Sequence, residues 1–158
     1  MAKKKTIRSI PQERTPMPEQ DPSVRARNFQ EVACGYTLEN ALREAERCLQ
    51  CADEPCIRGC PVGIDIPAFI QKISEKHYHG AYDVITDTNL LPSVCGRVCP
   101  QENQCEGVCT VGDTLAPVAI GRLERFVGDM AIKEGWVNVP YIEPSGFKVG
   151  IVGSGPAG

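Results

Sequence analysis

Cysteine is the residue that most constrains this chain, because eight of its nine cysteines fall in two short blocks. The first block is Cys48-x2-Cys51-x4-Cys56-x3-Cys60, followed directly by Pro61. The second block is Cys95-x3-Cys99-x5-Cys105-x3-Cys109, with Pro100 after its second cysteine. Four thiols in so short a stretch can converge on one inorganic centre at a small cost in chain entropy. The two blocks therefore predict two such centres.

Iron–sulfur clusters fit these blocks better than the alternatives. Thiolates are the usual ligands of such clusters, and a cysteine followed by proline closes the bacterial ferredoxin motif, although the spacings here differ. A disulfide framework is disfavoured, because the number of cysteines is odd and no apolar signal segment follows Lys3–Lys5. Zinc modules show two short cysteine pairs, often with histidine, whereas His77 and His79 lie far from both blocks. Packing as buried free thiols suits Cys34 and Cys95, but not eight clustered residues.

The bulk properties narrow the class of protein further. The chain has 158 residues and a net charge of −3, with a pI of about 5.4. It has no basic stripe and no apolar run of membrane-spanning length, so we expect no nucleic acid and no membrane partner. Without a signal segment and with many free cysteines, we expect a cytoplasmic protein. Aromatic residues make up only 6%, so we expect inorganic clusters to support the fold.

Apolar periodicity predicts an all-α body, since no β-alternation appears before residue 147. The expected helices are 38–49 with Thr37 as N-cap, 66–77 with Asp65 as N-cap, 81–88 after an interruption at Gly80, one or two turns within 93–99, and 117–133 opened by Pro117. The first cysteine block thus begins at the end of a helix and continues into a loop.

Both ends of the chain differ from this body. Residues 1–25 contain four prolines and predict an extended, mobile arm, and residues 26–138 form the helical domain. After a linker at 139–147, residues 148–158 predict a buried strand that enters G-x-G-x-x-G at Gly153, Gly155 and Gly158, a pattern that binds dinucleotide pyrophosphates. One strand cannot form a Rossmann sheet. We therefore expect this segment not to be ordered as a strand by itself, and the chain to be the front of a longer polypeptide.

Glu124 needs a separate interpretation. It borders the apolar stripe of the last predicted helix, and Gly121 and Gly128 on its flank would permit close approach of another group. From periodicity alone, an ordinary surface glutamate is the better interpretation.

The segments Arg47–Pro61 and Cys95–Cys109 resemble the N-terminal iron–sulfur domain of the small subunit of NADPH-dependent glutamate synthase. The same domain type occurs in dihydropyrimidine dehydrogenase and in the large subunit of the electron-bifurcating NADH-dependent ferredoxin:NADP oxidoreductase. The resemblance runs from about residue 25 to the end of the chain, and its last stretch is similar to the start of the FAD-binding domain of those proteins.

The resemblance implies a helical, ferredoxin-like domain with two 4Fe–4S clusters whose ligands cross between the blocks. One cluster would be held by Cys48, Cys51, Cys56 and Cys109, and the other by Cys60, Cys99, Cys105 and Glu124. Glu124 takes this role because Ile120–Phe126 matches the family segment that supplies a Gln or Glu ligand, which reverses the surface interpretation. Cys95 would be left over as a thiol that only packs.

The resemblance also implies an electron-transfer function. NADPH would reduce FAD in the C-terminal part, and the clusters would pass electrons to a larger catalytic subunit or a ferredoxin-linked partner. No residue here is expected to act as a general acid, base or nucleophile, so this part alone should catalyse nothing. Two alternatives stay open: the same domain in a bifurcating NAD(P)H:ferredoxin oxidoreductase, and a zinc-stabilised docking module.

Overall fold

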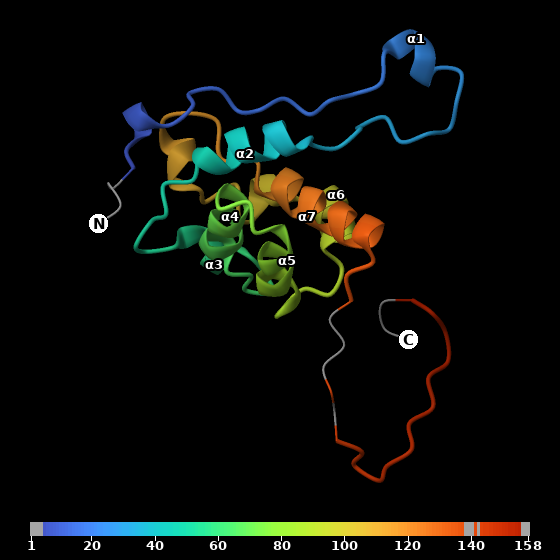
Figure 1. Ribbon diagram of the computed structural model, residues 1–158. Coiled ribbons are helices and arrows are strands. Elements are labelled where there is room, and N and C mark those ends of the chain that lie inside the picture. Colours follow the sequence, from blue (N-terminus) through green and yellow to red (C-terminus); the bar gives the residue numbers. More distant parts are fainter. Residues whose placement is uncertain (1–4, 138–140, 142, 156–158) are drawn as a thin grey trace.

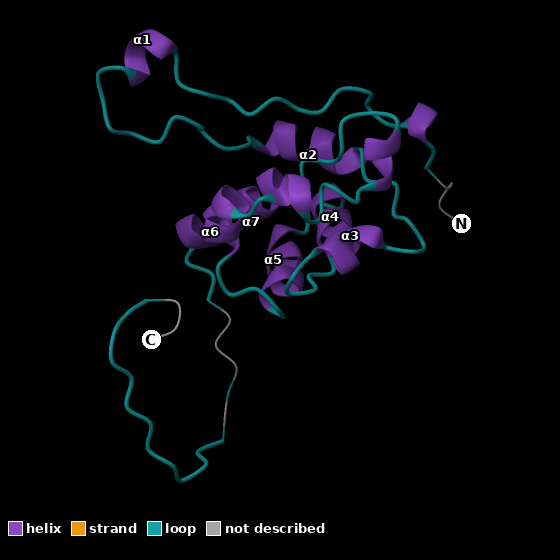
Figure 2. Cartoon of the chain, turned by 180° about the vertical axis from the view of Figure 1, so that it is seen from behind, coloured by secondary structure: helices purple, strands orange, loops and turns teal. Residues whose placement is uncertain are grey.

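The computed structural model describes residues 5–137, 141 and 143–155. This part of the chain contains helices and loops but no β-strand, apart from one isolated bridge between Glu19 and Ala33, so the all-α prediction is confirmed for it (Figure 2). Among the described helices, none combines the length and the apolar character needed to cross a membrane.

The helices follow the chain in the order shown in Figure 1. They are α1 (Pro22–Arg25), α2 (Leu38–Glu46), α3 (Pro55–Gly59), α4 (Ile66–Ser74), α5 (Tyr78–Thr86), α6 (Pro92–Val98) and α7 (Ile120–Glu134), with 3-10 turns η1 (Ile7–Ser9), η2 (Gln101–Asn103) and η3 (Thr110–Asp113). Both predicted N-caps are present. The Thr37 hydroxyl accepts a hydrogen bond from the Asn40 amide at 3.2 Å, and the Asp65 carboxylate accepts one from the Ala68 amide at 3.0 Å.

Two predicted helix starts are wrong, each for a physical reason. Helix α5 begins at Tyr78, so Gly80 lies inside it; a Cβ there would lie 2.5 Å from His77 Nδ1, so a larger residue would require the His77 side chain to move. Helix α7 begins at Ile120 and not at Pro117. The Pro117 carbonyl accepts from Arg47 Nη1 at 3.1 Å, and the Gly121 amide that would have bonded to it donates instead to Glu106 Oε1, also at 3.1 Å.

The core lies where α4, α5 and α7 meet beneath α2. Its fully buried side chains include Phe69, Ile73, Ile85, Leu123 and Val127. Burial of each such side chain stabilises the folded state by about 1.5–3 kcal/mol relative to leaving it exposed. The short α6 packs closely along α7, and glycines make this possible: a Cβ on Gly96 would lie 2.5 Å from the Arg125 amide nitrogen, and one on Gly128 would collide with Ser93.

The N-terminal arm is extended, as predicted, but the expectation that it is mobile is wrong for the part that packs on the bundle. Ile10 and Thr15 are 5% and 1% exposed. The Thr15 amide donates to Glu44 Oε2 at 2.7 Å, and the Tyr36 hydroxyl donates to the Thr15 carbonyl at 2.6 Å. Only the far end of the arm, around α1, extends beyond the bundle (Figure 1).

The C-terminal segment leaves the helical body and is exposed at residues 143–155. It forms no strand there, in line with the expectation that a single strand has no sheet to join. The Rossmann strand itself therefore stays a prediction. Gly153 and Gly155 lie in this exposed segment, and Gly158 lies outside the described residues, as do residues 139, 140 and 142 of the predicted linker.

Candidate iron–sulfur centres

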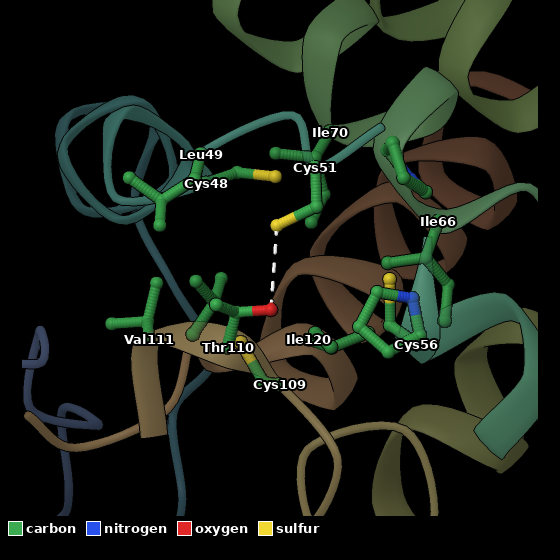
Figure 3. Close-up of a pocket in the computed structure, with 13 residues that line it drawn as sticks. Cys48, Leu49, Cys51, Cys56, Ile66, Ile70, Cys109, Thr110, Val111 and Ile120 are labelled. Atoms are coloured by element: carbon green, nitrogen blue, oxygen red, sulfur yellow. Dashed lines mark hydrogen bonds between the residues drawn. The ribbon is translucent and has the colours of Figure 1, made fainter. Parts of the chain in front are cut away.

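Four cysteines line one cavity, called here the first cavity. These are Cys48, Cys51, Cys56 and Cys109. The cavity has an empty volume of about 370 Å³, part of which opens to solvent, and its remaining wall is mostly apolar. Figure 3 shows the sulfur atoms of Cys48 and Cys51 pointing into this space, with Cys56 across it. Thiol donors around a mostly apolar cavity are a donor set that suits an iron–sulfur cluster.

The local backbone brings the first three of these cysteines together. Cys48 follows Arg47, the C-cap of α2, and Cys56 lies in the first turn of α3, which Pro55 opens. Between them, Gln50 and Glu54 have φ values of 54° and 44°, in the left-handed region that non-glycine residues rarely adopt. These two positions turn the chain back sharply, which lets a short loop surround one cavity.

Two polar side chains contact the cysteine sulfurs of the first cavity. Gln50 Nε2 donates to Cys48 Sγ at 3.4 Å and to the Pro67 carbonyl at 2.9 Å. The Cys51 thiol donates to Thr110 Oγ1 at 3.5 Å (Figure 3). A thiolate has no proton to donate, so on a ligated Cys51 the Thr110 hydroxyl would become the donor.

A second cavity lies on the other side of Ile66 and Ile120, which line both. The groups around it that can ligate iron are Cys60, Cys95, Cys99, Cys105 and Glu124. Its empty volume is about 520 Å³, again partly open, and its polar wall also includes Asn89, Gln101 and Gln104. Four thiols and one carboxylate around a single cavity also suit a cluster, because thiolates are the usual ligands of iron–sulfur clusters.

Glu124 reaches this cavity from the buried side of α7. Its side chain is 6% exposed, so the interpretation as a surface glutamate is wrong. Burial raises the pKa of Glu124 to about 7, and the hydrogen bond that Oε1 accepts from Asn89 Nδ2 at 2.7 Å acts in the opposite direction. Gly121, one turn earlier, leaves room for the Gln101 side chain, which would collide with a Cβ at that position.

Four of the thiols around the two cavities, those of Cys48, Cys56, Cys99 and Cys105, have raised pKa values. Burial, followed by the charge of neighbouring cysteines, raises the pKa of Cys56 to about 12 and that of Cys99 to about 11. Burial, then the adjacent Glu106, raises the pKa of Cys105 to about 12, and burial raises the pKa of Cys48. Metal binding requires thiolates, so a positively charged iron centre would have to displace these protons.

The cysteines do not sort by sequence block. Cys60 of the first block lines the second cavity, and Cys109 of the second block lines the first. Cys95, expected only to pack, lines the second cavity and donates to Asn89 Oδ1 at 3.5 Å. Within the described residues, no three His, Cys, Asp or Glu side chains lie close enough together to hold a single metal ion. A four-iron cluster is wider than one ion, and its ligands surround a cavity.

Sequence reasoning missed three polar residues, namely Asn89, Gln50 and Thr110. The sequence offered one hint about these residues, because Asn89 lies shortly before Pro92. An asparagine near a proline is typical of a turn, however, and does not indicate a cluster site. The cysteine blocks also contain Gly59, Gly96 and Gly107, whose backbone amides are candidate donors to sulfur. The Gly107 amide instead donates to the Gln101 carbonyl at 3.1 Å. Gly59 and Gly96 lie where a side chain has little room. A Cβ at Gly59 would lie 2.6 Å from Val108 Cγ2, and a Cβ at Gly96 would lie 2.5 Å from the Arg125 amide nitrogen.

Fold and sites together define a helical domain with two cysteine-lined cavities, the class that carries iron–sulfur clusters. The chain belongs to the family described as dihydropyrimidine dehydrogenase domain II, 4Fe-4S cluster, whose model matches residues 25–136. The resemblance derived from the cysteine blocks is therefore confirmed.

Curated relatives carry the names expected from that resemblance. A glutamate synthase (NADPH) small chain of Halomonas elongata is 41% identical over 143 residues, which cover 89% of this chain and 30% of that protein. The Escherichia coli K12 small chain is 37% identical over 147 residues, covering 92% of this chain and 31% of that protein. The Escherichia coli K12 NAD-dependent dihydropyrimidine dehydrogenase subunit PreT is 42% identical over 129 residues, which cover 81% of this chain and 31% of that protein. The chain spans less than a third of the length of these relatives.

Proposed function

We propose that this chain is an electron-transfer module that holds two 4Fe–4S clusters within a longer NADPH-dependent flavoprotein of the glutamate synthase type. Electrons would arrive from an FAD reduced by NADPH in another part of the polypeptide and leave for a larger catalytic subunit. A bound cluster supplies one-electron acceptance and release at a potential that the surrounding protein sets.

The proposed ligand assignment combines the lining of the two cavities with the family resemblance, which leaves Cys95 out. Cys48, Cys51, Cys56 and Cys109 would hold the first cluster, and Cys60, Cys99, Cys105 and Glu124 the second. The single observation that carries the proposal is that cysteines from both sequence blocks line each of two separate cavities. The residues of this chain bind and orient the clusters, keep water away with apolar walls, and place hydrogen-bond donors near sulfur.

The remaining parts of the proposal concern the rest of the polypeptide. We propose that residues 1–25 are an arm, 26–138 the cluster domain and 139–147 a linker, and that 148–158 begin an FAD-binding domain at Gly153, Gly155 and Gly158. The φ of 113° at Gly153 supports this, because glycine adopts that conformation readily and other residues do not.

A second candidate is the same module in a NAD-dependent dihydropyrimidine dehydrogenase. The specific observation in its favour is the 42% identity to the PreT subunit. Both candidates share the clusters and the flavin and differ in the nicotinamide used and in the partner. Stopped-flow reduction of the full-length protein by NADPH and by NADH separates them, because the preferred nucleotide reduces the flavin and bleaches the clusters faster.

The ligand assignment is tested by exchange of single ligands. Cys109→Ser should damage only the first cluster, and Glu124→Ala only the second, as measured by iron content and by electron paramagnetic resonance (EPR) of the reduced protein. Cys95→Ser should keep both clusters. Loss of a cluster in Cys95→Ser, together with two normal clusters in Glu124→Ala, would show that each sequence block supplies its own four cysteines.

A further inference from the structure

Asn89 lies at the centre of a short chain of hydrogen bonds that ends on the Glu124 carboxylate. Its Nδ2 donates to Glu124 Oε1 at 2.7 Å, and the two residues are 7% and 6% exposed. Asn89 comes from the loop between α5 and α6, whereas Glu124 lies on α7. The contact therefore joins two parts of the wall of the second cavity that are far apart in the sequence.

The surroundings of Asn89 fix which end of its amide faces Glu124. Its Oδ1 accepts from the Leu91 amide at 3.0 Å and from the Cys95 thiol at 3.5 Å. An amide oxygen only accepts and an amide nitrogen only donates. With two donors on Oδ1, the NH2 group is directed toward the carboxylate, so Asn89 presents a donor there independently of Glu124.

This hydrogen bond engages one oxygen of the carboxylate. Among the described residues, Glu124 Oε1 accepts only from Asn89 and Oε2 accepts from none, while the side chain lines the cavity. A glutamate side chain loses considerable rotamer freedom when it is ordered. A carboxylate already held by one oxygen has lost part of that freedom before a metal binds, and ligating carboxylates are commonly oriented by such a partner.

We propose that Asn89 is a positioning residue for the second cluster: it holds the Glu124 carboxylate toward the cavity, and Cys95 supports that cluster by fixing the Asn89 amide without ligating iron. The inference rests on the proposed function, because it gives Asn89 a task only if Glu124 is a ligand.

The primary test compares Asn89→Ala with Asn103→Ala. Asn103 is exposed, lies in η2 between Cys99 and Cys105, and does not line the cavity, so it is a matched control. In anaerobically prepared protein, Asn89→Ala should shift the EPR g values and midpoint potential of the second cluster, or lower the iron content from about eight toward about four per chain. The signal of the first cluster should stay unchanged, and Asn103→Ala should match the wild type.

A double-mutant cycle separates positioning from general structure. Glu124→Cys replaces the carboxylate with a thiolate that has no oxygen for Asn89 to hold. If Asn89 acts through Glu124, adding Asn89→Ala to Glu124→Cys should change the second cluster several-fold less than it does in the wild type. An equal change in both backgrounds would overturn the proposal.

The pair Cys95→Ala and Cys95→Ser provides an independent test if Asn89→Ala fails to fold. Serine can donate to the same Oδ1 and alanine cannot. Cys95→Ala should keep the full iron content but shift the second cluster in the same direction as Asn89→Ala, and Cys95→Ser should restore the wild-type signal. Iron loss in Cys95→Ala would show that Cys95 is a ligand, and an unshifted signal would show that it has no effect; either result contradicts the inference.

Different experimental results would contradict the inference about Asn89 and the proposed function. Wild-type protein without a second cluster would overturn both. A normal second cluster that does not respond to Asn89→Ala would overturn the inference and leave the proposed function intact.

Discussion

At the scale of single residues, the two cavities differ in how their sulfur atoms are contacted. Beside the first cavity, Gln50 and Thr110 contact Cys48 and Cys51 through side-chain polar atoms. Beside the second cavity, the Cys95 thiol donates a hydrogen bond to the Asn89 side chain. Hydrogen bonds to sulfur stabilise the more negative reduced state, so we expect the first cluster to respond to polar substitutions next to its cysteines.

Thr110→Val should lower the midpoint potential of the first cluster. It removes one hydroxyl that can donate to the Cys51 thiolate and keeps nearly the same side-chain shape. One hydrogen bond of about 0.5–1.5 kcal/mol corresponds to roughly 20–60 mV for one electron. Redox titration followed by EPR measures the shift. Thr114→Val is the control, because Thr114 is exposed and does not line the cavity; an equal shift in both variants would contradict the assignment.

The sequence predicted the iron–sulfur class of the domain from particular residues. The cysteine spacing predicted two centres, and the position of Glu124 within Ile120–Phe126 marked the one acid that reaches the second cavity. Asn89 could not be predicted, because its contact with Glu124 depends on α6 packing against α7 at a distance that only the folded chain sets. For the same reason, Cys95 was expected only to pack.

At the scale of elements, capping residues and helix spacing were predictable, and helix starts that depend on distant groups were not. Thr37 and Asp65 act through neighbouring amides, so local sequence shows them. The start of α7 is displaced from Pro117 by hydrogen bonds from Arg47, which lies on another helix end. The helix α3 within the first cysteine block was also missed, because Pro55–Gly59 is too short for apolar periodicity to show.

An ion-pair network joins α6 to α7 and should make stability depend on pH. Arg97 Nη1 and Nη2 donate to Asp129 Oδ1 and Oδ2 at 2.7 Å and 2.9 Å, and Arg125 Nε donates at 3.2 Å. Burial raises the pKa of Asp129, but these donors and Ser93 outweigh it and hold the pKa below its ordinary value. A lowered folded-state pKa stabilises the protein above the unfolded value of about 3.9, and this contribution is lost as pH falls through the folded-state pKa.

Asp129→Asn should therefore lose less stability than the wild type as the pH falls from about 5 to about 2. Urea denaturation at each pH measures the free energy of unfolding. The acid sensitivity of the clusters is common to both proteins, so the difference between them isolates Asp129. Asp87→Asn, at an exposed carboxylate after α5, should follow the wild type. Parallel pH profiles for Asp129→Asn and the wild type would contradict this account.

At the scale of the whole molecule, one buried ion pair connects the arm, α2 and the entry to α7. Glu44 and Arg47 are fully buried and 2.8 Å apart. Glu44 accepts from the amides of Thr15 at 2.7 Å and Ala119 at 2.8 Å, and Arg47 donates to the carbonyl groups of Pro11, Ala116 and Pro117. The arm is thus part of the fold, which its proline-rich sequence did not indicate.

Glu44→Ala should lower the free energy of unfolding by about 3–5 kcal/mol, because it leaves the Arg47 guanidinium buried without its counter-charge. It should also release the arm near Thr15, which hydrogen exchange at that amide would detect. Glu46→Ala, two residues further along at an exposed position, should change stability by less than about 0.5 kcal/mol. Similar losses in the two variants would show that the pair does not anchor the arm.

The central claim is that the two cavities hold two four-iron clusters. Its most direct test is the metal and sulfide analysis of the protein purified and reconstituted without oxygen, combined with EPR after reduction. The account predicts about eight iron and about eight sulfide per chain, and two reduced-cluster signals that Cys109→Ser and Glu124→Ala alter separately. Stoichiometric zinc without sulfide, or a single cluster that both variants abolish, would contradict it.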